Sequence, residues 1–173
     1  MSGTSSPRAV IAVLGLAVGL LLCPSFADAR PARLAVFAFE LFDTSLQGEI
    51  EGPDPAELAR LEMIDRELRQ GLAASGRFEL IDTAPAAASI ESAGHLRTCN
   101  GCEVPIAASL GADLTMVGWV QKVSNLILNI NVTIRDVASR ELLFAGSVDI
   151  RGNTDESWRR GVRHLLQNRL LAD

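Results

Sequence analysis

The residues best suited to chemistry in this 173-residue chain are two cysteines in a short turn. Cys99 and Cys102 are separated by two residues, a spacing that suits a local disulfide, a redox-active dithiol or half of a zinc site. In an oxidising compartment this pair favours a structural disulfide that pins the loop. Redox activity needs a stabilised thiolate, and the neighbouring Glu103 opposes it.

Zinc binding would need further ligands beside these cysteines. His95 precedes the pair, but the only other histidine is His164, and no second cysteine pair exists. Haem attachment is excluded because glutamate, not histidine, follows Cys102. The sequence therefore predicts a disulfide, with thiol–disulfide exchange or metal handling as the alternative role of the pair.

A second set of candidate ligands lies in a long acidic loop expected over residues 42–55. Its oxygen-bearing side chains follow the spacing of a calcium-binding EF-hand loop, with a glycine where that loop turns sharply. The ligands would be Asp43, Ser45, Gln47, Glu51 and Asp54. Serine and glutamine replace the usual acidic ligands, and an aspartate replaces the closing glutamate. A solvated acidic loop is the competing interpretation of this calcium or lanthanide hypothesis.

Other catalytic signatures are missing from the sequence. There is no G-x-S-x-G elbow, no phosphate-binding glycine loop and no H-E-x-x-H zinc motif. We therefore expect a protein that is not an enzyme and that carries no cofactor.

The first 29 residues are typical of a secretory signal peptide. Arg8 provides a positive start, and an uncharged apolar run extends over residues 9–22. This run is shorter than the about 20 apolar residues of a membrane span and fits a signal peptide. A small-x-small cleavage site ends at Ala29. Cys23 follows a leucine instead of the small residue of a lipobox, so we expect a periplasmic protein without a lipid anchor.

The charge balance restricts the partners. The formal net charge is −5, which argues against nucleic acid or an anionic membrane surface as the binding partner. Lys122 is the only lysine of the chain. The residues that remain after cleavage, 30–173, fit one domain and predict no membrane span.

Hydrophobic spacing predicts an α/β domain, an α+β sandwich with the element order βαβααβββα. Period-two patterns and helical patterns alternate along the chain, and the last three strands should form an antiparallel meander. Strands are expected over residues 33–41, 78–81, 114–122, 126–135 and 142–151. Helices are expected over 55–75, 84–92 and 106–110, with a last one opened by Asn153 or Thr154. The polar flank of that last helix carries Arg159, Arg160 and Arg163, interpreted as a solvated face.

A candidate binding surface lies on the polar face of the meander. Asn129, Asn131 and Arg135 alternate with apolar residues, so they share one face of a strand. Arg151 belongs to the neighbouring strand, and Trp119 lies on the strand before. The competing interpretation is a hydrated sheet face with Trp119 in the strand core.

Three segments carry a resemblance to known envelope proteins. LAVFAFE, LRQGLAASGRFELID and AASLGADLTMVGWVQKVSNLILNINVTIRDVASREL resemble the TolB amino-terminal domain and the related periplasmic domains of CsgG and LpoB. The resemblance covers most of residues 33–170. It implies a mixed sheet of about five strands with helices packed on it. It also implies, by analogy, a protein that binds other envelope proteins.

Two further segments resemble a family of small secreted bacterial proteins of unknown function. They are KVSNLILNINVTIRD and SVDIRGNTDESWRRG. Members of that family tend to be encoded near quinoprotein alcohol-oxidation genes, which implies an accessory role in that chemistry or in envelope assembly. We expect a periplasmic protein that docks on an envelope partner. The sequence specifies neither the partner nor the oligomeric state.

Overall fold

The computed structural model describes Met1 and residues 30–172, so the expected signal peptide and its cleavage site lie outside the described residues. Six strands form one mixed sheet in the order β3-β1-β4-β5-β6, and β2 also pairs with β4. The strands are β1 (Ala32–Val36), β2 (Glu40–Asp43), β3 (Phe78–Ile81), β4 (Leu114–Ser124), β5 (Ile127–Asp136) and β6 (Leu142–Arg151). Neighbouring strands β4, β5 and β6 are antiparallel, which confirms the predicted meander.

Five α-helices accompany the sheet in the described part of the chain. They are α1 (Leu46–Glu51), α2 (Pro55–Ala74), α3 (Ala87–Ala93), α4 (Glu103–Ser109) and α5 (Asp155–Leu165). A 3₁₀ turn over Ala84–Ala86 precedes α3, and a π-helical turn over Leu166–Leu170 follows α5. The mixed α+β sandwich is confirmed, and none of these helices is long and apolar enough to cross a membrane.

The strand expected over residues 33–41 is divided into β1 and β2. Both run parallel to β4, but the step from Val36 to Glu40 spans four residues where the partner step from Met116 to Trp119 spans three. The extra residue breaks the ladder, as in a bulge. Phe39 lies in this break and packs over Gly118, where a Cβ atom would lie 2.6 Å from its ring. The sheet therefore has six strands instead of about five.

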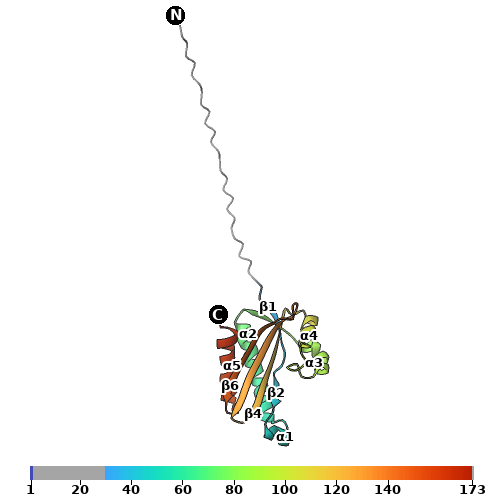
Figure 1. Ribbon diagram of the computed structural model, residues 1–173, viewed down its shortest axis with the longest axis vertical. Helices are drawn as coiled ribbons and strands as arrows, with labels where there is room; N and C mark the ends of the chain where they lie inside the picture. Colours follow the sequence, from blue (N-terminus) through green and yellow to red (C-terminus); the bar gives the residue numbers. More distant parts are fainter. Residues whose placement is uncertain (2–29, 173) are drawn as a thin grey trace.

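Helices lie on both faces of the sheet (Figure 1), and the two faces bury different clusters of side chains. Helices α2 and α5 cover one face, and α3 and α4 cover part of the other. The main core includes Ile64, Leu68, Met116, Ile130 and Trp158, all almost completely buried. Burying each of these side chains contributes about 1.5–3 kcal/mol. The face under α2 and α5 thus provides most of the driving force for folding.

Helix ends follow the capping residues of the sequence. Asp54 caps α2, since its Oδ1 accepts a hydrogen bond from the backbone N–H of Ala56 at 2.8 Å. Gly76 follows the end of α2 with φ +67°, the conformation that glycine tolerates best. Thr154 caps α5 and forms a capping box with Ser157. Asn153, the alternative cap from the sequence, is therefore free for another contact.

Candidate functional site

One end of the domain combines α1 with the turn between β4 and β5. We call this region, residues 43–54 and 122–127, the hairpin end (Figure 1). The segment expected as an acidic loop contains the short helix α1. Ser45 starts it, because its Oγ accepts a hydrogen bond from the N–H of Gly48 at 3.1 Å. The capping serine was the sequence feature that could have predicted this helix, because six residues are too few for a periodic pattern.

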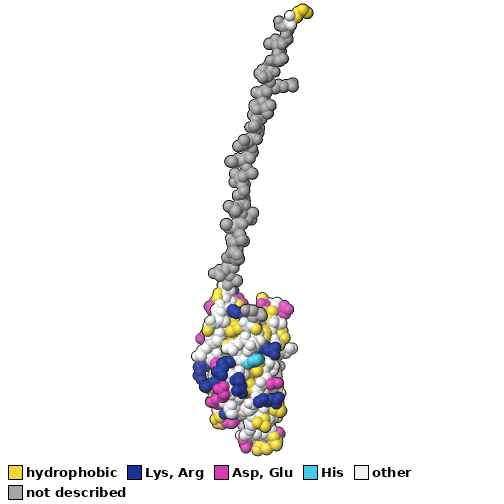
Figure 2. Space-filling model, turned by 90° about the vertical axis from the view of Figure 1, so that its left-hand side faces the viewer, with side chains coloured by type: hydrophobic (Ala, Val, Ile, Leu, Met, Phe, Trp, Pro, Cys, Tyr) yellow, Lys and Arg dark blue, Asp and Glu magenta, His cyan; other side chains and the backbone are white. Residues whose placement is uncertain are grey.

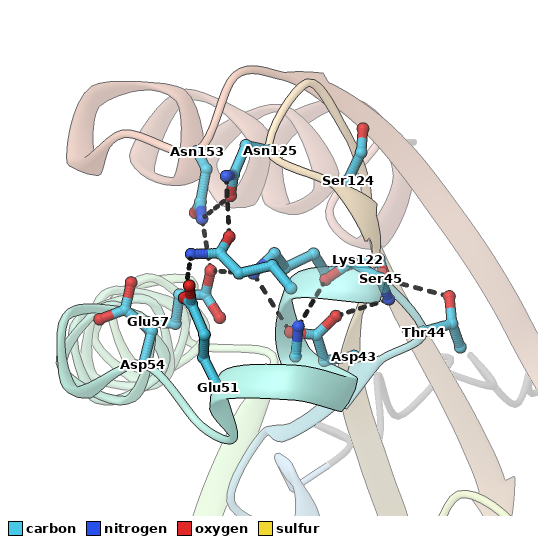
Figure 3. Close-up of polar contacts among 12 residues, drawn as sticks. Asp43, Thr44, Ser45, Glu51, Asp54, Glu57, Lys122, Ser124, Asn125 and Asn153 are labelled. Carbon is cyan, nitrogen blue, oxygen red and sulfur yellow. Dashed lines mark hydrogen bonds and ion pairs between the residues drawn. The ribbon is translucent and has the colours of Figure 1, made fainter.

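A buried ion cluster supports the hairpin end from inside. Lys122 and Glu57 are each 1% exposed, and Nζ of Lys122 lies 2.6 Å from Oε1 of Glu57. Oδ2 of Asp43 lies 3.1 Å from the same Nζ, as an ion pair without the alignment of a hydrogen bond (Figure 3). Since an unpaired charge at this depth costs several kcal/mol, the three groups must be buried together.

The ionisation of this cluster follows from its contacts. Burial opposes the charge on Lys122, but Glu57 and Asp43 outweigh it, so the pKa of Lys122 is raised. Burial likewise opposes the charge on Asp43, yet hydrogen bonds from Ser45 and the contact with Lys122 lower the pKa of Asp43. Both groups are charged at neutral pH. Lys122 is therefore a permanent cation that organises the chain around it.

A hydrogen-bond network extends from this cluster toward the surface, as Figure 3 shows, and also to Trp158 in the core. Asn153 donates from Nδ2 to Oε1 of Glu57 at 2.5 Å, and its Oδ1 accepts from the indole N–H of Trp158 at 2.9 Å. Nδ2 of Asn153 also contacts Oδ1 of Asn125 at 3.2 Å. Asn125 in turn donates to Oε1 of Gln47 at 2.9 Å. Helices α1, α2 and α5 and the β4–β5 turn are thereby joined into one frame.

The predicted calcium ligands have other partners in this structure. Asp43 faces Lys122, Ser45 and Asp54 cap helices, and Gln47 bonds Asn125 and Glu51. Their carboxylates do not gather. In residues 30–172, the only group of three close Cys, His, Asp or Glu side chains is Cys99, Cys102 and Glu103, and the disulfide removes both cysteines as metal ligands. Cation binding by the loop stays a prediction, and it would require Asp43 to leave Lys122.

The outer surface of the hairpin end is apolar. Leu46, Ile50 and Leu126 are 70%, 72% and 72% exposed, more than any other large hydrophobic residue that the structure describes except Met1. Figure 2 shows hydrophobic side chains at this lower end of the domain. The exposed acidic residues Glu49 and Glu51 lie beside them on α1. An exposed apolar group of this kind, on a rigid frame, is suited to contact with another protein.

Cys99 and Cys102 form the expected disulfide, just before α4. The turn between them is tight, with positive φ angles at Asn100 and Gly101. Both cysteines pack against the smaller core under α3 and α4. Oε1 of Glu103 lies 3.1 Å from Nε of Arg135, so the carboxylate next to the disulfide has its own partner. His95 contacts Glu40 instead, at 3.4 Å.

The predicted polar surface is assembled on one sheet face. Trp119 lies opposite Asn131 in the register, and Asn129 lies opposite Asp149, which it bonds at 2.6 Å. Arg135 and Arg151 have the same parity on β5 and β6, so they share this face. Trp119 is half-buried and packs on the cluster under α3 and α4. Partner binding by this face stays a proposal.

The sheet order and the helix layers define an LpoB-type α+β domain. The LpoB C-terminal domain from Salmonella enterica has 18% sequence identity and a TM-score of 0.50, over 72% of this chain and 87% of that chain. Its Escherichia coli counterpart has 17% identity and a TM-score of 0.50, covering 69% and 82%. The hypothetical protein CT253 from Chlamydia trachomatis has 14% identity and a TM-score of 0.50, covering 79% and 94%. At these low sequence identities, the similarity shows a shared fold only.

The chain belongs to the DUF3280 family, described as "Protein of unknown function (DUF2380)", whose model matches residues 32–170. A search of curated proteins finds no match. The expected membership of a family of unknown function with an LpoB-type fold is therefore confirmed.

Proposed function

We propose that this protein is an exported, non-enzymatic accessory protein that docks on another protein of the cell envelope through the hairpin end. The proposal rests on one observation: charged side chains are buried and apolar side chains are exposed at that end, the reverse of the core. Lys122 is buried there against Glu57 of α2, while Leu46, Ile50 and Leu126 are exposed. Exposed apolar side chains that gather at one place mark interaction sites in soluble proteins.

Charge favours a protein as the partner. Glu49 and Glu51 border the apolar residues, and the chain as a whole carries −5. An anionic lipid surface or a nucleic acid would be repelled. A protein surface with an apolar centre and a basic rim would complement this end.

The chemistry of Lys122 supports a role without catalysis. A nucleophilic or basic lysine needs a lowered pKa and access to substrate. Lys122 has a raised pKa and is 1% exposed, with both of its partners fixed. The amine of Lys122 therefore holds the structure together, and the exposed surface of the hairpin end is left for binding.

The proposal is tested by chemical crosslinking in periplasm followed by isolation of the tagged protein. The wild type should retain a specific partner, and Leu126→Asp combined with Ile50→Asp should lose it. Leu143→Asp is the matched control, because Leu143 is 54% exposed but lies on β6. Partner recovery by the double variant equal to wild type would contradict docking through the hairpin end.

The more specific roles that the sequence suggests are tested separately. A link to quinoprotein-dependent alcohol oxidation predicts that the crosslinked partner belongs to that system. Thiol–disulfide exchange predicts that Cys99 and Cys102 are alkylated in the native protein, as read by mass spectrometry. Calcium binding predicts terbium luminescence that Asp43→Ala abolishes.

A further inference from the structure

Strand β6 is a long sheet edge with nothing paired to its outer side in the described chain. It pairs with β5 and ends the strand order, and it is 10 residues long. The opposite edge strand, β3, has 4 residues. Proteins usually shield long edges with proline, lysine or a covering segment. β6 has no proline or lysine, so its outer backbone N–H and C=O groups are available for pairing.

A groove runs between this edge and α5. It has a volume of about 580 Å³, and β6 contributes residues 147–151 to its wall. Arg151, Arg160, His164 and Arg169 also line it. Figure 2 faces this side of the domain and shows basic side chains gathered there. We call it the β6 groove.

The arginines of the β6 groove are free of ion pairs with carboxylates in residues 30–172. Arg163, on the same helix, lies 3.6 Å from Glu67 and 3.7 Å from Glu156. The single carboxylate in the lining is Asp149, whose Oδ1 accepts a hydrogen bond from Asn129 at 2.6 Å. A chain of net charge −5 thus keeps a local excess of positive charge beside an open strand edge.

We propose that the β6 groove binds an extended, acidic segment of a partner protein as an additional strand. The outer backbone groups of β6 would pair with the segment, as in other cases of strand addition. Arg160 and Arg169 would bind its carboxylates, because arginine forms strong, directed hydrogen bonds with them. The groove starts next to the hairpin end, since Arg151 lies opposite Ile127 in the register. The β6 groove is nevertheless a separate surface, so strand addition there can be disproved without affecting the proposed docking through the hairpin end.

The test uses a labelled synthetic peptide of alternating threonine and glutamate, titrated with the full exported protein in fluorescence anisotropy. Saturable binding is expected, and Arg160→Glu should weaken it by about tenfold or more. Arg159→Glu is the matched control, because Arg159 changes the same charge on α5 outside the groove lining. Leu126→Asp should bind the peptide like wild type. That separates this proposal from docking at the hairpin end.

Two further probes decide whether the peptide adds a strand. Backbone N-methylation at alternate peptide residues removes hydrogen-bond donors while keeping the charge, and it should abolish binding. Amide hydrogen exchange of residues 147–151, the β6 part of the groove wall, should slow when the unmodified peptide is bound. Equal binding of the N-methylated peptide or of polyphosphate would reveal an electrostatic anion site and overturn strand addition. Absence of saturable binding to the unmodified peptide would also overturn it.

Discussion

The core under α2 and α5 and the hairpin end distribute polarity in opposite ways. In the core, Ile130 and Trp158 are fully buried and drive folding by leaving water. At the hairpin end, Lys122 is buried against Glu57 of α2, while Leu46 and Leu126 are exposed. The two regions are neighbours in the sheet, since Leu128 of the core lies opposite Lys122 in the register. The change from buried apolar residues to a buried charge therefore occurs within one pair of strands, β4 and β5.

This difference separates residues that hold the fold from residues that are available for binding. The ion cluster holds β2, α2 and β4 together beside α1 and the β4–β5 turn, through contacts that need both partners. The exposed leucines have no such role in the described structure, so the fold should tolerate their replacement. Substitutions in the two regions should therefore change the free energy of unfolding by different amounts.

The largest loss is expected for Lys122→Met. This change leaves Glu57 and Asp43 buried without their cation, which should lower the free energy of unfolding by about 3–5 kcal/mol. Urea unfolding at pH 7 measures it. Combining Lys122→Met with Glu57→Leu should recover part of the loss, because an apolar pair can replace a buried ion pair. A loss below about 1 kcal/mol in the single variant would show that the cluster does not hold the hairpin end.

Truncating a core side chain gives a reference value for the stability loss of Lys122→Met. Leu128→Ala removes a fully buried side chain and should cost about 2–5 kcal/mol through lost burial and a cavity. Unlike Lys122→Met, it should show no dependence on ionic strength, because no charge is left unpaired. The same urea experiment at low and high salt checks the distinction. Equal salt sensitivity of the two variants would remove it.

A smaller, pH-dependent effect is expected for Asp43→Asn. The pKa of Asp43 is held below its ordinary value of 3.8, so its stabilising contribution is present above that pH and is lost as the pH falls through the folded-state pKa. The variant should be less stable than wild type at pH 7 by about 1–2 kcal/mol. The gap should shrink as the pH falls below 3.8 and through the lowered folded-state pKa, because the wild-type carboxyl then also becomes neutral. A gap independent of pH would contradict this account of Asp43.

The smallest change in stability is expected for Leu126→Asp. Its side chain is 72% exposed, and surface substitutions usually alter the free energy of unfolding by no more than about 0.5 kcal/mol. Thermal unfolding with circular dichroism checks this. A loss comparable to Leu128→Ala would mean that Leu126 supports the fold, which would end the contrast between the two regions.

The sequence predicts the core more completely than the hairpin end. Alternation over residues 126–135 gives β5 and the meander, and the helical spacing of leucines gives α2. Both patterns are local. The ion cluster joins residues from β2, α2 and β4, so its assembly depends on the sheet register.

Signals for that cluster were nevertheless present. Glu57 stands four residues before Leu61, on the apolar stripe of α2, and Lys122 continues the buried face of Met116 and Val120 on β4. A charge at an apolar position predicts a buried partner. The exposure of Leu46 and Ile50 was harder to predict. Both lie on α1, and a helix of six residues is too short to give a periodic pattern.

Site-specific photo-crosslinking at position 126 in exporting cells tests the central claim most directly. A photoreactive amino acid in place of Leu126 should give one dominant protein adduct, and the same amino acid in place of Leu143 should not give that adduct. The adduct should also disappear when Ile50→Asp is added. No adduct at position 126, or the same adducts at both positions, would contradict docking through the hairpin end.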